Sequence, residues 1–205
     1  MVDGTVRAHD LLWIAEDAEL LPKVEPDWVR DALSLMPVVV VRRAEAPPGF
    51  AAVGIRGQSR ELRFAAFVEL RHVKHLQTPE SLASQRRWLE SLAATPPHLR
   101  EALTLFNELS VRQKFVWGPV GSVGYQLATG LPVTSGESDV DVLIRCLVPP
   151  DPLMLSAVRD VARKRMNRLD VILEGPPGAV ALEELHSREV LLKTSRGPRM
   201  AAFTW

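Results

Sequence analysis

The sequence predicts a protein of the α/β (α+β) class, in which a small α+β domain precedes a mixed sheet that carries helices on one face. Three observations predict this class. Residues 38–73 contain strand-like runs separated by turn residues, whereas residues 114–193 alternate between strand-like and helix-like patterns. Apolar residues make up 46% of the 205-residue chain, which is enough for a buried core.

The first domain is expected to cover residues 1–85 and to contain a small antiparallel sheet. Its expected elements are a short strand or turn at 9–14, a helix between Pro26 and Pro37, and strands at 38–42, 51–56 and 62–73. Pro26 suits the start of a helix, and Pro37 stops it. Proline, glycine and serine at 47–49 and 57–59 are typical of the turns that join antiparallel strands.

The second domain is expected to cover residues 86–205, with the boundary in a helical stretch between residues 80 and 95. The stretches Thr78-Pro79 and Thr95-Pro96-Pro97 each resemble a helix start, because a hydroxyl can cap the helix and proline suits its first turn. Beyond them, strands and helices alternate. The expected order is a strand at 114–117, a helix after Gly121-Ser122, a strand at 139–145, a helix from Asp151-Pro152, a strand at 169–173, a helix ending near His186 and a strand at 190–193.

The charge balance and the termini limit the classes of function. Lysine plus arginine and aspartate plus glutamate number 25 each, so no net charge draws the chain to nucleic acid or to an acidic membrane surface. The single cysteine, Cys146, cannot form an internal disulfide and is expected to be a core thiol. Neither an export signal nor an apolar run long enough to cross a bilayer is visible. We therefore expect a cytoplasmic protein that binds neither nucleic acid nor membrane.

Two aspartates on one predicted strand are the first candidate site residues. Asp139 and Asp141 are two positions apart, so both carboxylates leave the same face of the strand, with their Cα atoms about 7 Å apart. Two carboxylates this close repel each other unless a cation lies between them. An isolated pair of this kind is more often a solvated strand edge than a catalytic site. The neighbouring sequence decides between these alternatives.

A third carboxylate and a glycine-serine turn favour the catalytic interpretation. Asp170 begins the next expected strand, so three carboxylates meet if the two strands are neighbours. Three such groups suit two Mg²⁺ ions about 3.5–4 Å apart, with Mn²⁺ as the alternative metal. Gly121 lets a phosphate approach the backbone, and Ser122 adds a hydroxyl at a helix start. Asp170 is the least specific member, because aspartate is also common at strand starts.

At these residues the sequence resembles the nucleotidyltransferase superfamily, whose signature is a Gly-Ser turn, an Asp-x-Asp strand and a third acid on a later strand. Residues 118–132 and 138–145 are more closely similar to the phosphoribosyl-dephospho-CoA transferases, the MdcG family of holo-acyl-carrier-protein synthases for malonate decarboxylase. The likeness extends through 37–43 and 53–57 and covers nearly the whole chain. It implies a nucleotidyltransferase-like second domain.

The resemblance also implies a reaction and roles for the candidate residues. A serine of the acyl-carrier subunit of malonate decarboxylase would attack the α-phosphate of 2′-(5″-triphosphoribosyl)-3′-dephospho-CoA, and pyrophosphate would leave. Asp139 and Asp141 would be catalytic metal ligands, Gly121 and Ser122 would bind the triphosphate, and Asp170 would bind metal and help to take the serine proton. The gap between Ser122 and Asp139 is longer than in many small nucleotidyltransferases. The loop at 131–137 is therefore expected to shape the substrate pocket.

Other interpretations remain open at this point. The chain could be a nucleotidyltransferase with a different acceptor, either a small molecule or another protein, or an inactive nucleotidyltransferase fold that serves as a binding module. The basic groups that hold pyrophosphate are also not determined. The candidates are Arg159, Arg163, Lys164, Arg165 and Arg168 after the acidic strand, for which a solvated helix face is the favoured interpretation, and Lys193, Arg196 and Arg199 near the C-terminus.

Overall fold

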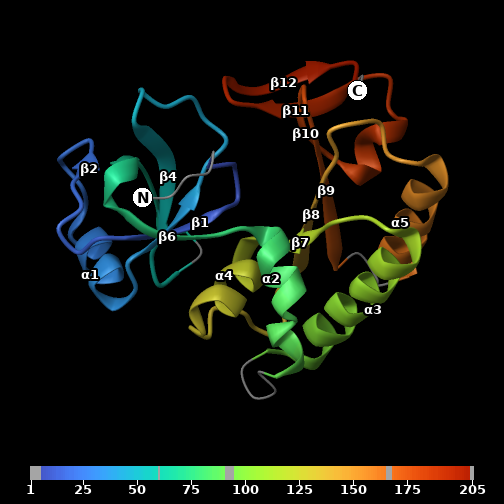
Figure 1. The fold of residues 1–205 in the computed structure, drawn as a ribbon, viewed down its shortest axis with the longest axis horizontal. Coiled ribbons are helices and arrows are strands. Elements are labelled where there is room, and N and C mark those ends of the chain that lie inside the picture. The colour runs from blue at the N-terminus through green and yellow to red at the C-terminus, as the bar shows by residue number, and fades with distance from the viewer. Residues whose placement is uncertain (1–5, 60, 91–94, 165–167, 204–205) are drawn as a thin grey trace. The chain divides into compact units, whose positions relative to one another are not determined.

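The computed structural model describes residues 6–59, 61–90, 95–164 and 168–203. The chain divides into two compact units, residues 1–78 and 79–205. Each unit contains a six-stranded sheet (Figure 1). The expected mixed α/β class is therefore observed, and the sheet of the second unit holds the candidate acids.

The first unit is an antiparallel sheet with one α-helix over one face. Its elements are β1 (Leu11–Ile14), β2 (Leu20–Leu21), α1 (Asp27–Leu35), β3 (Val38–Val41), β4 (Phe50–Arg56), β5 (Arg63–Glu69) and β6 (Val73–Gln77), and the strand order is β2-β5-β4-β3-β1-β6. Fully buried Val29 of α1 packs in one core with Val39, Val53 and Val68 of the sheet. Alternate strand residues point to the same face, so every second valine or isoleucine reaches this core.

Two features of the first unit differ from the sequence prediction. The expected strand at 62–73 is two strands, β5 and β6, separated by a short 3₁₀ turn at Leu70–His72. Strand β2 was not predicted, because its two residues are too short to show an alternating pattern. The remaining strands and α1 lie within two residues of their expected positions.

The second unit combines a mixed sheet with four α-helices of the described chain. Its elements are α2 (Pro79–Gln85), α3 (Pro97–Gln113), β7 (Gly118–Pro119), α4 (Gly121–Thr129), β8 (Val140–Arg145), α5 (Pro152–Lys164), β9 (Leu169–Gly175), β10 (Gly178–Ala181), β11 (Val190–Thr194) and β12 (Gly197–Ala201). The strand order follows the chain, β12-β11-β10-β9-β8-β7. Among the described strands, only β8 and β9 pair in parallel, and helix α5 connects them.

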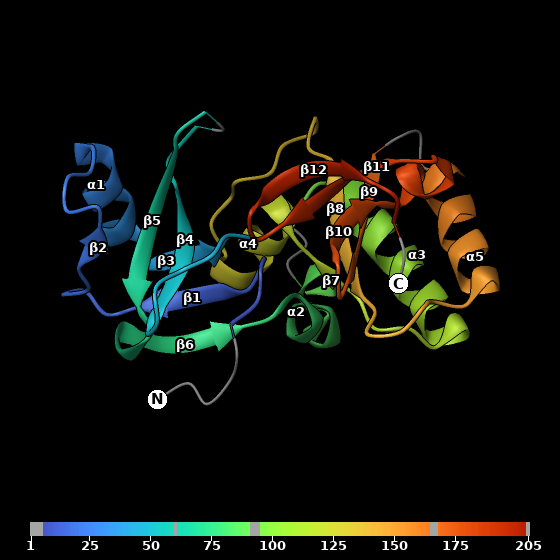
Figure 2. The same cartoon turned by 90° about the horizontal axis from the view of Figure 1, so that it is seen from above.

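Helices cover both faces of this sheet, rather than one face as the sequence predicted. A Cβ on Gly118 would meet the backbone of Pro79 at the start of α2, whereas the ring of the preceding Trp117 lies 4.9 Å from that of Phe106 in α3. Successive strand residues point to opposite faces, so α2 and α3 lie on opposite sides of the sheet. Both views agree, with α2 and α4 on one side of β8 and α3 and α5 on the other (Figures 1 and 2).

The burial of β8 gives the physical reason for this difference. Val142 is 0% exposed and its neighbour Leu143 is 1% exposed, although they point to opposite faces. A strand whose residues are buried on both faces needs cover on both faces. Helices on one face alone, as the sequence predicted, would leave either Val142 or Leu143 uncovered.

Three further predictions for the second unit were wrong in detail. The expected strand at 114–117 is displaced, because β7 pairs with β8 only at Gly118 and Pro119. The expected helix before His186 begins instead with strand β10, followed by a 3₁₀ turn at Leu182–His186. Strand β12 was missed, although it pairs with β11 over five residues. These strands are short and rich in glycine and proline, which hides the alternating pattern that identifies a strand.

The division between the units falls before α2, whereas the sequence analysis placed α2 in the first domain. The guanidinium of Arg145 in β8 donates hydrogen bonds to both carboxylate oxygens of Glu80 in α2, at 2.7 and 2.8 Å. It also donates to Glu174 of β9 at 3.3 Å. Because Arg145 and Glu80 are largely buried, this ion pair ties α2 to the second sheet.

No helix of the described residues has the length and apolar character needed to cross a membrane.

Candidate active site

The candidate acids lie on one face of the second sheet, at the start of its two parallel strands. Asp141 of β8 pairs in register with Asp170 of β9, so their side chains leave the same face on strands about 4.8 Å apart. Asp139 lies just before β8 and is exposed. The two strands expected to carry the acids are therefore neighbours in the sheet. This arrangement depends on the parallel pairing of two strands that are consecutive in the sheet.

Electrostatic interactions link the acids. Partial burial and the negative charge of Asp139 raise the pKa of Asp170 above its usual value, whereas the positive charge of Lys193 acts in the opposite direction. A like charge raises a carboxyl pKa only at short range, so Asp139 and Asp170 are electrostatic neighbours. The acids thus form a site that favours a cation.

Gly121 lies directly against Asp141. Its φ angle is +63°, and a Cβ at this position would be 2.1 Å from Oδ2 of Asp141. The backbone amide of Val120 also donates to the carbonyl of Asp141 at 2.9 Å. Both the left-handed conformation and the close approach require glycine. Glycine is therefore required in the Gly-Ser turn for a second reason, which the sequence did not reveal. Only glycine leaves space for the Asp141 carboxylate.

Ser122 follows in the first turn of α4 and is half-buried. The first amides of a helix lack partners within the helix and carry partial positive charge, so this end of α4 suits an anion. Gly121 therefore lies beside Asp141, and Ser122 follows it in the first turn of α4.

The donor atoms of the site suit a hard divalent cation. Carboxylate oxygens are the ligands that Mg²⁺ and Mn²⁺ prefer. Within the described ranges, however, no three histidine, cysteine, aspartate or glutamate side chains are gathered as a metal site. The backbone places Asp141 beside Asp170 at the start of β8 and β9, with Asp139 just before β8.

Gln126 anchors the loop that leads to Asp139, and the sequence analysis missed it. The side chain is 4% exposed. Its Oε1 accepts hydrogen bonds from the amides of Val133 and Thr134, both at 2.9 Å, and from the hydroxyl of Thr134 at 2.8 Å. Its Nε2 donates to Thr95 at 3.2 Å. A buried glutamine within an otherwise apolar helix face is the signal that could have identified it.

The end of this loop that precedes Asp139 is held next to the acids. The guanidinium of Arg168 donates to the carbonyl of Gly136 at 2.6 Å, and a ring nitrogen of His98 lies 3.1 Å from the carbonyl oxygen of Ser138. The amide of Val140 donates to the carbonyl of Arg168 at 2.7 Å. The loop expected to shape the substrate pocket is therefore held at its middle and at the end that precedes Asp139.

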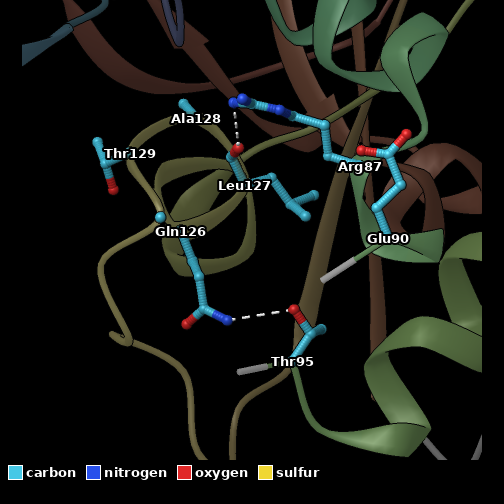
Figure 3. A pocket seen from close by; sticks show the side chains of 8 residues that line it. Arg87, Glu90, Thr95, Gln126, Leu127, Ala128 and Thr129 are labelled. Atoms are coloured by element: carbon cyan, nitrogen blue, oxygen red, sulfur yellow. Dashed lines mark hydrogen bonds between the residues drawn. The ribbon is translucent and has the colours of Figure 1, made fainter. Parts of the chain in front are cut away.

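Described residues of the second unit line two pockets near the candidate site. One, of about 380 Å³, is lined by Arg87, Gln126 and the C-terminal residues of α4, and none of the candidate acids lines it (Figure 3). The other, of about 250 Å³, is lined by Asp141, Asp170 and Lys193 among others. The chemistry expected from the acids belongs to the second pocket.

The fold and the site together define a two-unit α/β protein whose second unit carries acids on neighbouring parallel strands beside a helix that begins with glycine. Two family models cover almost the whole described chain. The phosphoribosyl-dephospho-CoA transferase MdcG N-terminal domain matches residues 7–79, and the MdcG C-terminal domain matches residues 81–203. The chain therefore belongs to the phosphoribosyl-dephospho-CoA transferase MdcG family.

Full-length relatives support this assignment. A phosphoribosyl-dephospho-CoA transferase of Pseudomonas putida (strain GB-1) is 40% identical over 97% of this chain and 95% of its own length. Relatives with the same name are 37% identical in Klebsiella pneumoniae, over 100% of this chain and 98% of their own, and 36% identical in Azotobacter vinelandii, over 96% and 93%. No solved structure gives a significant match. The transferase family expected from the sequence is thus confirmed.

Proposed function

We propose that this chain transfers the phosphoribosyl-dephospho-CoA group from 2′-(5″-triphosphoribosyl)-3′-dephospho-CoA to a serine of the acyl-carrier subunit of malonate decarboxylase. The observation that carries the proposal is the similarity to phosphoribosyl-dephospho-CoA transferases over nearly the whole length of both chains. The aspartates at the start of β8 and β9 support the proposal. Phosphoryl transfer needs positive charge near the phosphates, and carboxylates can bind the metal ions that supply it.

The proposed reaction is a substitution at the α-phosphorus of the donor. The serine oxygen forms a new bond to this phosphorus, while the bond from the phosphorus to the oxygen that bridges to the β-phosphate breaks. The electron pair of the broken bond leaves with pyrophosphate. The serine proton would pass to the carboxylate of Asp170.

The proposed cofactor is Mg²⁺, with Mn²⁺ as a substitute, and Asp139, Asp141 and Asp170 would hold it in a nucleotidyltransferase-like site. The bound metal would neutralise phosphate oxygens and the developing charge on the leaving group. The carboxylates themselves orient the reacting groups at the start of β8 and β9. The amides and hydroxyl of Gly121 and Ser122 bind the triphosphate at the start of α4.

Intact-mass measurement of the apo acyl-carrier subunit tests the proposed function. After incubation with the enzyme, the triphosphoribosyl donor and Mg²⁺, the subunit should gain the mass of the phosphoribosyl-dephospho-CoA group, and pyrophosphate should appear in equal amount. Replacing the donor with ATP should give little transfer. Transfer from ATP to another acceptor, without labelling of this subunit, would favour a nucleotidyltransferase of different specificity. Binding without turnover by any donor would favour an inactive binding module.

A further inference from the structure

We propose that Lys193 binds the terminal phosphates of the donor, the part that leaves as pyrophosphate. The inference rests on the proposed function and adds a residue to its site. Sequence alone left eight basic residues as candidates for this role, on α5 and near the C-terminus. The pairing of the strands shows which of these residues lie on the face of the sheet that carries the acids.

Strand register places Lys193 on the face that carries the acids. Lys193 of β11 pairs with Ala179 of β10, and Ala179 pairs with Glu174 of β9. Glu174 is four residues after Asp170 on the same strand, so the two share a face. Because paired residues on neighbouring strands point to the same face, Lys193 lies on the face of the sheet that carries Asp170.

Lys193 also reaches the space beside the acids. It lines the pocket of about 250 Å³ together with Asp141 and Asp170. Pockets for whole drug-sized ligands measure about 300–1,000 Å³, so this pocket fits a part of the donor, such as its phosphates.

The charge of the substrate gives the chemical reason for a lysine here. The triphosphate of the donor is strongly negative, and it must lie beside three carboxylates. Negative charge grows on the leaving pyrophosphate as the phosphorus–oxygen bond breaks, and an ammonium positioned there stabilises it. Lysine is a common phosphate ligand because its ammonium donates three hydrogen bonds.

The other described candidates are placed less well. Arg199 of β12 pairs with Leu192, the neighbour of Lys193, and therefore lies on the opposite face. Arg159 and Arg163 belong to α5, which packs with α3 on that opposite face. The guanidinium of Arg168 bonds to the loop carbonyl of Gly136. Arg196 lies in the turn between β11 and β12, Arg165 lies outside the described residues, and the side chain of Lys164 is not described either.

Titration calorimetry with inorganic pyrophosphate and Mg²⁺ tests the proposal on the full chain. Loss of one charge-assisted hydrogen bond predicts that Lys193→Ala weakens pyrophosphate binding by about tenfold or more. Lys193→Arg keeps the charge and should recover most of the affinity. Arg199→Ala is the matched control, since it removes a positive charge from the same hairpin on the other face, and should bind pyrophosphate within about twofold of the unmodified protein.

Steady-state kinetics provide the second measurement. In Lys193→Ala the KM for the triphosphoribosyl donor should rise and kcat should fall, while the KM for the acyl-carrier subunit stays unchanged. Equal pyrophosphate affinity and an unchanged donor KM in Lys193→Ala would overturn the role of Lys193 and leave the proposed function intact. Absence of carrier labelling by the unmodified protein would instead overturn the proposed function.

Discussion

Contact between Gly121 and Asp141 is the tightest constraint on any single residue of the site. The left-handed φ angle and the 2.1 Å approach of a hypothetical Cβ to the carboxylate act at the same position. Any side chain here must displace either the start of α4 or Asp141. Because misplacement of a catalytic group by about 1 Å can cost about a hundredfold in rate, this position should be intolerant of substitution.

We therefore expect Gly121→Ala to reduce transfer activity by about a hundredfold or more. Gly130→Ala is the control, because Gly130 also has a positive φ, +76°, but no atom lies within 4 Å of its Cβ position. It should cost about 1–2 kcal/mol of unfolding free energy and leave activity nearly unchanged. Activity assays and thermal unfolding of both variants check this expectation. Equal activity losses in the two variants would contradict it.

Cys146 allows a prediction from its ionisation. Burial raises the pKa of this thiol above its ordinary value, so less thiolate is present in the folded protein at any given pH. Since the thiolate is the reactive species, alkylation by iodoacetamide at about pH 8 should be slower in the folded protein than in denaturant. Mass spectrometry of the modified cysteine gives both rates. Faster alkylation of the folded protein would show that the thiol is activated.

At the scale of residues, the sequence predicted the acids but not all of their neighbours. The spacing of Asp139 and Asp141 predicted that both carboxylates leave the same face of one strand. The contact between Gly121 and Asp141 joins residues on different elements, so no local pattern contains it. Gln126 was missed for the same reason, because its partners lie beyond the helix that carries it.

Among the elements, the loop between α4 and β8 is the part most directly linked to the site. Gln126 holds its middle by three accepted hydrogen bonds, while Arg168 and His98 hold its end before Asp139. A fixed loop keeps Asp139 in place and forms a stable wall for the donor. The length of this loop does not indicate that it is ordered, since a long polar loop is also compatible with mobility.

We expect Gln126→Leu to loosen this loop and to lower kcat by about tenfold to a hundredfold. The variant leaves buried amides of Val133 and Thr134 without their acceptor, which should cost about 1–3 kcal/mol of unfolding free energy. Hydrogen exchange should then accelerate at these two amides. Thr104→Val, which removes one hydroxyl bond within α3, is the control and should change neither property by much. Unchanged exchange at both amides in Gln126→Leu would contradict the anchoring role.

The strand order of the second sheet shows which elements could be predicted. The parallel pair β8 and β9 followed from the alternation of strands and a helix, and this pair carries the acids. The terminal hairpin β11–β12 did not follow, because Gly197 and Pro198 conceal a strand pattern. The hairpin matters because it brings Lys193 toward the acids from a distant part of the chain.

For the whole molecule, two units of different architecture agree with the two domains of one transferase family. The family models meet at residues 79 and 81, next to the structural division at residues 78 and 79. The class could be predicted because strand runs and strand-helix alternation occupy separate halves of the sequence. The cover on both faces of the second sheet could not, since it depends on α2 and α3 packing from opposite sides.

The central claim is that the acids of the second unit catalyse transfer to the acyl-carrier subunit. Intact-mass analysis of that subunit, after incubation with donor, Mg²⁺ and either the unmodified enzyme or its Asp139→Asn and Asp141→Asn variants, tests it most directly. We expect the unmodified enzyme to add one phosphoribosyl-dephospho-CoA group and the folded variants to add it at least about a thousandfold more slowly. Labelling at the unmodified rate by either folded variant would contradict the account.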